Sequence, residues 1–341
     1  MSARLILEDG AVFEGTSAGA EGVAFGEAVF TTAMSGYQEV ATDPSFEGQI
    51  VCFTAPMVGN YGVDPSRDES VRAHAKAVVM REARGPEWTD WLRERGLVAI
   101  TGVDTRSLVL HLREQGAMRA AAATTDVSVD DVLAQPEMAG AALVAGVSTK
   151  EPYTFEERGA VRVAVVDYGC KRSILRRLTA NGAAVDVFPH DVDADSVAGY
   201  DGVLLSPGPG DPAPLVAETK SLQDLLGRTP VLGVCLGHQL LALATGKETY
   251  KLPFGHRGAN HPVVDHRSRK VLVTSQNHGF AVAAGDESGV THSSLYDGTV
   301  EGLSYPELRA RSAQFHPQAS PGPHDAAAII GGWVEELKSV A

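Results

Sequence analysis

The pattern of apolar and polar positions changes near residue 150 and divides the chain into two parts. In the first part, short apolar stretches come first and helical periodicity comes later. Strands are predicted for residues 4–8 and 11–14, joined by an Asp9-Gly10 turn, and for residues 28–32 and 49–54. Helices are predicted for residues 87–95 and 104–115, the second capped by Asp104 or Thr105. This order favours a compact α+β domain over residues 1–150.

In the second part, buried strands alternate with helices from Val161 onward. Strands are predicted for residues 161–166, 184–188, 202–205 and 230–234, and helices for residues 171–180, 215–226, 236–244 and 324–337. This alternation is typical of a parallel sheet that is covered on both faces and binds ligands beyond the carboxyl ends of its strands. Residues 148–158 are polar, include a proline and have no apolar period. We therefore predict a linker at 151–160 and a second domain at 161–341.

Composition excludes several classes of protein. A chain of 341 residues is long enough for two domains, and its net charge of −14 argues against nucleic acid or an anionic membrane as the main partner. Cys52, Cys170 and Cys235 show no paired spacing, which supports neither a disulfide framework nor a cysteine zinc site. The N-terminus lacks the features of a secretory signal, and no run of about 18 apolar residues occurs, so we expect a cytoplasmic protein.

The most informative motif is Gly233-Val234-Cys235-Leu236-Gly237, where a predicted strand gives way to a helix. The glycines permit the sharp turn that lifts a nucleophile clear of a sheet, with sulfur in place of the serine oxygen of a G-x-S-x-G elbow. A thiol at a helix N-terminus lies at the positive end of the helix dipole, which favours the thiolate. The motif by itself is also compatible with a buried structural cysteine in a tight turn.

A cysteine nucleophile needs a base, and His316 is the candidate among the eleven histidines. It follows the predicted strand 311–315 and precedes Pro317, which ends the strand and places the imidazole on a loop at the sheet edge. The loop 206–211 is rich in glycine and proline and either holds an oxyanion with its N–H groups or is a plain tight turn. Gln239, one helical turn beyond Cys235, either contacts a polar substrate or is a partly exposed helix residue.

Three segments of the second part together resemble the class I, triad-type glutamine amidotransferases. They are Gly-Val-Cys-Leu-Gly-His-Gln at 233–239, Ser-Pro-Gly-Pro-Gly-Asp-Pro at 206–212 and Phe-His-Pro at 315–317. Other segments resemble one branch of that family, the small chain of glutamine-dependent carbamoyl-phosphate synthase. These segments are residues 32–39, 42–45, 59–62, 102–106, 111–119, 254–262 and 275–280. The resemblance extends over nearly the whole chain.

The resemblance implies an α/β protein: an N-terminal α+β domain of the β/β/α type, specific to the small chain, followed by a flavodoxin-like, mostly parallel-sheet glutaminase domain. It implies that Cys235 is the nucleophile and His316 the base in the hydrolysis of L-glutamine through a γ-glutamyl thioester. Carried over residue by residue, the glutamine-binding positions are Ser45, Gly208, Gly210, Leu236, Gln239, Asn277, Gly279 and Phe280. Ser45 would then reach the site from the first domain.

The chain departs from the family pattern directly after His316. The family has His-Pro-Glu, in which the glutamate orients the histidine, whereas this chain has His316-Pro317-Gln318. A glutamine amide oxygen still accepts a hydrogen bond from the imidazole, as in Cys-His-Asn proteases, but without a negative charge to stabilise imidazolium. A neutral hydrogen bond to the imidazole is weaker than a charge-assisted one by roughly 1 kcal/mol, which predicts a glutaminase slowed about tenfold. The alternatives are a weakened or replaced glutaminase, or a substitution selected to slow turnover.

The resemblance also implies partners and cofactors. We recognise no phosphate-binding motif in the chain, so ATP and Mg²⁺ are expected on a separate large chain that makes carbamoyl phosphate for arginine or pyrimidine synthesis. The two chains are expected to form a hetero-oligomer in which this one supplies ammonia. His256, His261 and His266 match no standard zinc spacing, and no metal is expected in this chain. The alternative functions are an independent cysteine hydrolase of γ-glutamyl substrates and a non-catalytic scaffold for the large chain.

Overall fold

The computed structural model describes residues 1–285 and 288–340 and divides into two compact units. The first unit comprises residues 1–141 and 253–258, and the second comprises residues 142–252 and those from 259 onward. The predicted boundaries, with domains at 1–150 and 161–341 around a linker at 151–160, differ from this division at two places. The second unit begins earlier, and a short segment of the C-terminal half belongs to the first unit.

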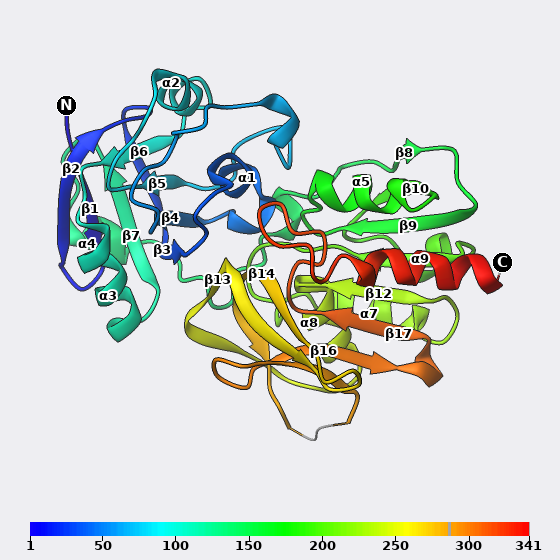
Figure 1. Cartoon of the computed structure of the whole chain (residues 1–341). Coiled ribbons are helices and arrows are strands. Elements are labelled where there is room, and N and C mark those ends of the chain that lie inside the picture. The colour runs from blue at the N-terminus through cyan, green and yellow to red at the C-terminus, as the bar shows by residue number, and fades with distance from the viewer. Residues whose placement is uncertain (286–287, 341) are drawn as a thin grey trace. The chain divides into compact units, whose positions relative to one another are not determined.

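A closed barrel forms the first unit (Figure 1), with strand order β1-β2-β6-β5-β4-β3-β7. Its strands are β1 (Ser2–Leu7), β2 (Val12–Ser17), β3 (Val23–Thr31), β4 (Gln49–Phe53), β5 (Ala77–Val79), β6 (Val98–Thr101) and β7 (Met118–Ala123). Its helices are α1 (Tyr37–Thr42), α2 (Pro86–Glu94), α3 (Thr105–Gln115) and α4 (Val129–Leu133), with the short 3-10 helices η1 (Pro44–Phe46) and η2 (Pro65–Arg67). Strands and helices therefore alternate here, and the prediction of strands first and helices later was wrong in this detail.

Two local predictions for the first unit are confirmed. The hairpin forms as predicted: Ile6 lies opposite Val12, and the N–H of Leu7 donates to the carbonyl of Ala11. Asp104 is the N-cap of α3, and its Oδ1 accepts from the N–H of Ser107 at 3.0 Å. This bond satisfies one of the unpaired N–H groups at the start of the helix.

Alternation along the barrel strands distributes apolar side chains between two clusters. Ile50 and Cys52 of β4 pack in one cluster with Leu108 and Leu112 of α3. The intervening Val51 packs in the other cluster, which contains Trp88 and Trp91 of α2. Strand β4 is thus buried on both sides, which explains why it forms a continuous apolar run rather than an alternating one.

The segment of residues 253–258 is tied to the barrel by its backbone and by one ring. The N–H of Ala117 donates to the carbonyl of Pro253 at 2.7 Å, and the N–H of Thr32 donates to the carbonyl of Arg257 at 3.1 Å. The ring of Phe254 stacks on Phe30 with centroids 6.0 Å apart. These contacts depend on residues far apart in the chain, so a local pattern does not predict them.

The second unit contains a ten-stranded sheet of order β14-β13-β15-β16-β17-β12-β11-β9-β10-β8 in the described residues. Five neighbours, β17 (Ala310–Ala313), β12 (Val231–Val234), β11 (Gly202–Leu205), β9 (Val161–Asp167) and β10 (Ala183–Pro189), are parallel. The remaining strands are β8 (Tyr153–Glu156), β13 (Thr249–Asp265), β14 (Val271–Val282), β15 (Val290–Ser294) and β16 (Val300–Tyr305). The parallel core matches the flavodoxin-like prediction, and the antiparallel extension was not predicted.

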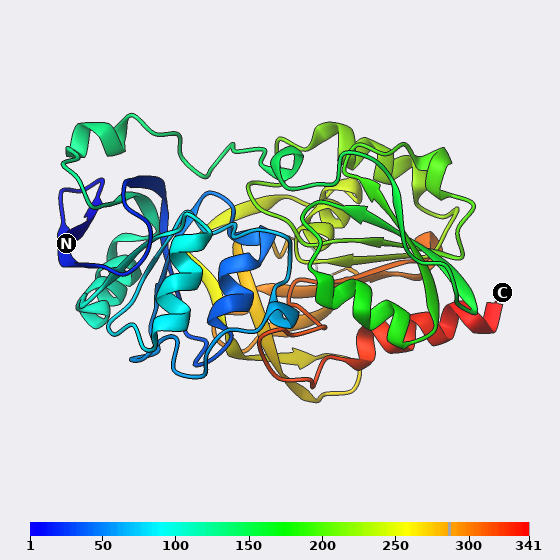
Figure 2. The same cartoon turned by 90° about the horizontal axis from the view of Figure 1, so that it is seen from above.

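Helices cover both faces of the parallel core, as the alternating pattern predicted. One face is covered by α5 (Arg172–Ala180) and α9 (Ala328–Val340). The other face is covered by α6 (Ala194–Val197), α7 (Val216–Leu225) and α8 (Leu236–Ala244). Two 3-10 helices, η3 (Val144–Gly146) and η4 (Pro306–Leu308), precede β8 and β17. Figure 2 shows α5 and the red α9 side by side along one side of the sheet. No helix among residues 1–285 and 288–340 is both long and apolar enough to cross a bilayer.

The predicted linker contains an unpredicted strand. β8 pairs antiparallel with the edge of β10, and the hydroxyl of Thr154 donates to the carboxylate of Asp186 at 2.6 Å. Its four residues, Tyr153–Glu156, alternate between apolar and polar types, but the pattern is short and was not recognised as a strand, and the side chains are largely exposed. The closing helix α9 also runs to Val340, three residues beyond its predicted end, and begins at Ala328 rather than at His324.

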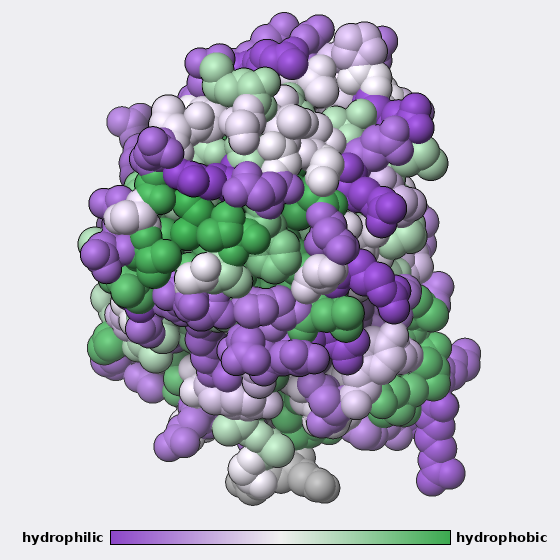
Figure 3. Space-filling model, turned by 90° about the vertical axis from the view of Figure 1, so that its left-hand side faces the viewer, coloured by the Kyte–Doolittle hydropathy of each residue, from purple (hydrophilic) through white to green (hydrophobic). Residues whose placement is uncertain are grey.

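The first unit carries an exposed apolar surface (Figure 3), where apolar side chains gather between hydrophilic ones. The large exposed apolar residues of this unit include Val12, Val23 and Leu133. Patches of this kind are commonly places where a protein meets a partner.

Candidate active site

Cys235 sits at the sharp turn that the glycine-flanked motif predicted. It is the residue before α8, with φ 53° and ψ −105°, a conformation that a side chain with a Cβ rarely adopts. Such strain costs on the order of 1–3 kcal/mol and is characteristic of functional positions. The turn is fixed by a hydrogen bond of 2.9 Å from the N–H of Cys235 to the carbonyl of Ala313. The thiol is buried, with 2% of the residue exposed.

Both glycines of the elbow are required by close backbone approach. A Cβ on Gly233 would lie 2.5 Å from the carbonyl oxygen of Gly237, and a Cβ on Gly237 would lie 2.4 Å from the carbonyl oxygen of Leu205. These distances are too short for any side chain. The glycines therefore allow α8 to start directly against the ends of β11 and β12.

His316 lies next to this turn because of the strand order. β12 and β17 are parallel neighbours with Val234 opposite Ala313, so Cys235 follows one strand and His316 follows the other at the same edge. The N–H of His316 donates to the carbonyl of Ser275 in β14 at 2.9 Å. The thiol of Cys235 donates to the carbonyl of Asn277, two residues further along β14, at 3.5 Å. Strand β14 thus contacts both residues.

Gln239 is buried and bonded rather than partly exposed. Its Nε2 donates to the carbonyl of Phe280 at 2.8 Å and to Oε1 of Gln314 at 3.1 Å. These bonds hold the side chain between α8 and β14. Gln314 was not singled out from the sequence. Its position two residues before His316, within the predicted strand 311–315, was the available signal, although β17 ends at Ala313 in the structure.

The loop after β11 lies against the start of α8. The N–H of Gly237 donates to the carbonyl of Ser206 at 3.2 Å, and a Cβ on Gly208 would lie 2.7 Å from Cδ2 of Leu236 and 2.3 Å from the carbonyl of Tyr168. Gly210 has φ 90°, the left-handed region that favours glycine. The loop is therefore a packed part of the site rather than a free surface turn.

Gln318, the residue expected to orient His316, contacts its imidazole. Its Nε2 lies 3.0 Å from Nδ1 of His316, and both residues are 2% exposed. With the amide nitrogen toward the ring, Nδ1 accepts and the ring proton resides on Nε2. With the amide turned by half a rotation, Oε1 accepts from Nδ1–H and Nε2 becomes the acceptor that a base needs. In the described residues Oε1 of Gln318 has no hydrogen-bond partner.

A second histidine beside the elbow is neutral at physiological pH. His238 is fully buried in α8, and its Nδ1 lies 2.8 Å from the hydroxyl of Ser312 in β17. Burial, with a smaller contribution from His292, lowers the pKa of His238 to about 3. The residue therefore braces α8 against β17 without carrying charge near Cys235.

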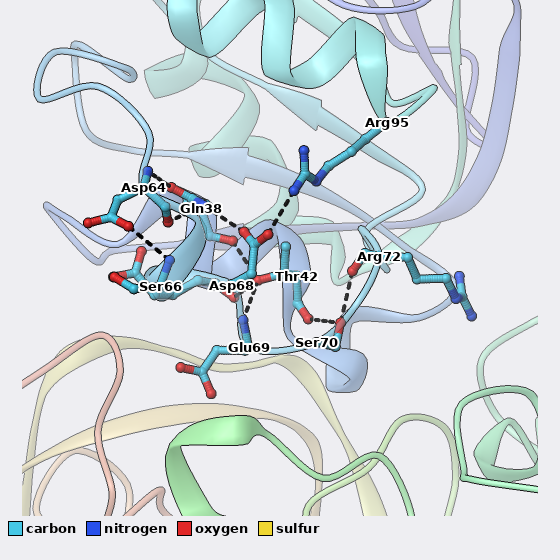
Figure 4. A network of polar contacts seen from close by, with 10 residues as sticks. Gln38, Thr42, Asp64, Ser66, Asp68, Glu69, Ser70, Arg72 and Arg95 are labelled. Carbon is cyan, nitrogen blue, oxygen red and sulfur yellow. Dashed lines mark hydrogen bonds and ion pairs between the residues drawn. The ribbon is translucent and has the colours of Figure 1, made fainter. Parts of the chain in front are cut away.

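In the first unit, a polar network ties the loop 64–72 to α1 (Figure 4). Nε2 of Gln38 donates to Oδ1 of Asp68 at 2.6 Å, and a guanidinium nitrogen of Arg95 donates to Oδ2 of Asp68 at 2.7 Å. The hydroxyl of Thr42 accepts from the N–H of Glu69 at 2.9 Å. The network fixes the end of α1, which is the segment that leads into Ser45.

Ser45 lies on η1 directly after α1. Its N–H donates to Oδ1 of Asp43 at 2.9 Å, which closes an Asp-Pro-Ser turn. The side-chain oxygen of Ser45 is buried and has no hydrogen-bond partner among the described residues. Buried hydroxyls are normally bonded, so this oxygen is suited to a ligand. Ser45 belongs to the first unit, and all the other predicted site residues belong to the second.

The three histidines that were weighed as a metal cluster do not share a unit. His256 belongs to the first unit, whereas His261 and His266 belong to the second. Nε2 of His266 lies 2.9 Å from the hydroxyl of Ser293, and the ring of His261 packs edge-on against Tyr296. The expectation that this chain holds no metal stays a prediction.

Comparison with known proteins gives two family matches and many relatives. Residues 5–122 match the family "Carbamoyl-phosphate synthase small chain, CPSase domain", and residues 164–334 match "Glutamine amidotransferase class-I". A carbamoyl phosphate synthase small chain from Chlorobaculum tepidum is 45% identical and covers 98% of this chain and 97% of its own length. The carbamoyl phosphate synthase small chain from Thermosynechococcus vestitus is 43% identical, and the match covers 99% of this chain and 97% of that one. A putative GMP synthase protein from Thermoplasma acidophilum, 20% identical, aligns with a TM-score of 0.47 over 53% of this chain and 96% of that one.

Proposed function

Because this chain belongs to the family of carbamoyl phosphate synthase small chains, we propose that it hydrolyses L-glutamine on Cys235 and delivers the ammonia to a large chain. Its role as the glutamine amidotransferase chain of that enzyme follows from the family. The observation that carries the chemistry is the strained turn at Cys235, at the same sheet edge as His316. A cysteine nucleophile needs a base such as histidine within reach, and the parallel pairing of β12 with β17 supports that arrangement.

The proposed reaction has two halves. Sγ of Cys235 attacks the side-chain carbonyl carbon of glutamine, and His316 passes the thiol proton to the amide nitrogen, so that the carbon–nitrogen bond breaks and ammonia leaves. Water then attacks the γ-glutamyl thioester while His316 takes its proton, and the carbon–sulfur bond breaks to give glutamate and the free thiol. The N–H of Leu236, at the N-terminus of α8, and those of the loop at Gly208 and Gly210 are proposed to hold the oxyanion.

We assign the recognition of glutamine to residues around the elbow. Asn277, Gly279 and Phe280 lie on β14, and Gln239 is anchored to that strand through the carbonyl of Phe280. The buried hydroxyl of Ser45 supports a part for that residue as well. Nucleotide chemistry with ATP and Mg²⁺ is assigned to the large chain, and the product is proposed to serve arginine or pyrimidine synthesis.

The test is substitution of the nucleophile in the complex with the large chain. Cys235→Ser should abolish glutamine hydrolysis and glutamine-dependent carbamoyl phosphate formation, while formation from added ammonium chloride persists. Acid quenching with labelled glutamine should trap a thioester in the wild type and none in the variant. Cys170→Ser, at a half-buried cysteine of the same unit, is the matched control and should retain activity. Persistent glutamine hydrolysis in Cys235→Ser would refute the assignment.

One observation favours a second candidate, a scaffold with attenuated glutaminase activity. Nε2 of Gln318 faces Nδ1 of His316, and in that arrangement the other ring nitrogen carries the proton and cannot receive one from the thiol. Near-zero glutaminase activity in the wild-type complex, together with full activity on ammonium chloride, would support this candidate.

A further inference from the structure

Glu301 is a buried carboxylate of the second unit that takes no part in the proposed reaction. It lies on β16, and none of its surface is exposed. Removing a carboxylate from water is unfavourable unless other groups bond to it. The partners of Glu301 therefore show what the residue holds in place.

The carboxylate of Glu301 contacts side chains of β14. Its Oε2 accepts from Nε2 of Gln276 at 2.7 Å, and its Oε1 lies 4.0 Å from Nε2 of His278. Nε2 of Gln276 also donates to the hydroxyl of Thr274 at 3.3 Å, and the residue is only 3% exposed. Thr274, Gln276 and His278 occupy alternate positions of the strand and so share one face of it. The carboxylate thus anchors that face of β14.

Gln276 lies between the two carbonyl groups of β14 that contact the nucleophile and the base. The carbonyl of Ser275 accepts from the N–H of His316 at 2.9 Å. The carbonyl of Asn277 accepts from the thiol of Cys235 at 3.5 Å. Alternate carbonyls of a strand point to the same edge. A shift of the strand at Gln276 would therefore move both acceptors together.

The backbone of Glu301 contacts the segment that leads into His316. Its carbonyl accepts from the N–H of Gln314 at 2.9 Å. Gln314 is fully buried, precedes His316 by two residues and accepts from Nε2 of Gln239 at 3.1 Å. Glu301 is thus bonded to β14 through its side chain and to the chain before His316 through its backbone.

We propose that Glu301 is a positioning residue for glutamine hydrolysis. It fixes Gln276, and through that residue the two carbonyls of β14, so that the thiol of Cys235 and His316 keep their reactive geometry. Small displacements of catalytic groups lower the rate strongly. The role requires an acceptor for the amide of Gln276 rather than a negative charge. This assignment rests on the proposed function, and Glu301 itself contacts no reacting atom.

The test is steady-state glutamine hydrolysis in the complex with the large chain. Glu301→Leu removes the acceptor and should lower kcat at least tenfold while changing the KM for glutamine less than threefold. Glu301→Gln keeps an acceptor oxygen and should retain kcat within threefold of the wild type. Glu307→Leu, the same change as in Glu301→Leu at an exposed glutamate of η4, is the matched control and should leave kcat unchanged. Carbamoyl phosphate formation from ammonium chloride should persist in every variant.

Gln276→Leu tests the same bond from the other side. It should lower kcat about as much as Glu301→Leu, and the double variant should lose no more than the weaker single variant, because all three lack one bond. Melting temperatures identify the variants that fold, and Gln276→Leu alone decides if Glu301→Leu does not fold.

The nucleophile variant separates this proposal from the proposed function. Wild-type kcat in Glu301→Leu and Gln276→Leu, with no hydrolysis in Cys235→Ser, would refute the positioning role and leave the function intact. Equal losses in Glu301→Leu and Glu301→Gln, or losses that multiply in the double variant, would also overturn it.

Discussion

At the scale of single residues, the contact between Gln318 and His316 decides how strong a base the site contains. Nε2 of Gln318 and Nδ1 of His316 are 3.0 Å apart and both side chains are almost fully buried, so water does not compete for this hydrogen bond. A neutral amide fixes the ring but offers no charge to a developing imidazolium. An amide can also present either of its polar atoms to Nδ1, whereas a carboxylate can only accept.

Gln318→Glu should therefore raise the glutaminase kcat about tenfold, which corresponds to about 1.4 kcal/mol of transition-state stabilisation. The measurement is steady-state glutamine hydrolysis in the complex with the large chain. Gln223→Glu, the same chemical change at an exposed glutamine, should leave kcat unchanged. An unchanged kcat in Gln318→Glu would show that residue 318 does not tune the base.

His238 should make stability depend on pH. Its pKa is about 3 in the folded chain because it is buried, against about 6.5 when unfolded, so the unfolded chain binds the proton first as the pH falls. The contribution of neutral His238 to the free energy of unfolding is present above about pH 6.5 and is lost progressively as the pH falls towards 3. About 2 kcal/mol of it is lost between pH 7 and pH 5.

Urea unfolding at pH 7 and pH 5 tests this. In His238→Asn the loss on acidification should be smaller by about 2 kcal/mol than in the wild type. His266→Asn, at an exposed histidine, should show the wild-type loss. Equal pH dependence in His238→Asn and the wild type would contradict the assignment.

At the scale of elements, the elbow works because two strands and one helix meet without side chains between them. A Cβ at Gly237 would lie 2.4 Å from a backbone oxygen of β11, which cannot move aside as a side chain would. Gly237→Ala should therefore displace the start of α8, destabilise the chain by about 1–3 kcal/mol and lower glutaminase activity at least a hundredfold.

Gly332 provides the matched comparison, because a Cβ there meets no atom within 4 Å. Gly332→Ala in α9 should keep full activity and add up to about 1 kcal/mol of stability, since alanine is the better helix former. Chemical denaturation and a glutaminase assay measure both effects. Wild-type activity in Gly237→Ala would contradict the prediction, because it would show that the start of α8 can accommodate a Cβ at position 237.

At the scale of the whole molecule, one segment of the C-terminal half completes the N-terminal unit. Phe254 packs on Phe30, and neighbouring backbone groups bond to Ala117 and Thr32. Phe254→Ala should destabilise the first unit by about 2 kcal/mol or more. Hydrogen exchange should then quicken in β3 and β7 and stay unchanged in β9. Phe155→Ala, on the exposed strand β8, should not alter exchange in β3 or β7, and equal protection of these strands in Phe254→Ala would contradict the prediction.

Several features were determined by the sequence alone because their causes are local. The hairpin at Asp9-Gly10, the cap at Asp104, the alternation of strands and helices after Val161 and the turn at Cys235 depend on residues within a few positions of each other. The motifs around Cys235, His316 and Ser45 also pointed to the family that the relatives share.

Other features were decided only by the tertiary structure, because they join residues distant in the chain. Barrel closure, the edge strand β8 and the transfer of residues 253–258 to the first unit depend on pairings with partners that no local period marks. The sequence was equally compatible with a partly exposed Gln239, and only its hydrogen bonds to Phe280 and Gln314 place it in the interior. Periodicity records which face of an element is buried, but the identity of the neighbour is set by packing.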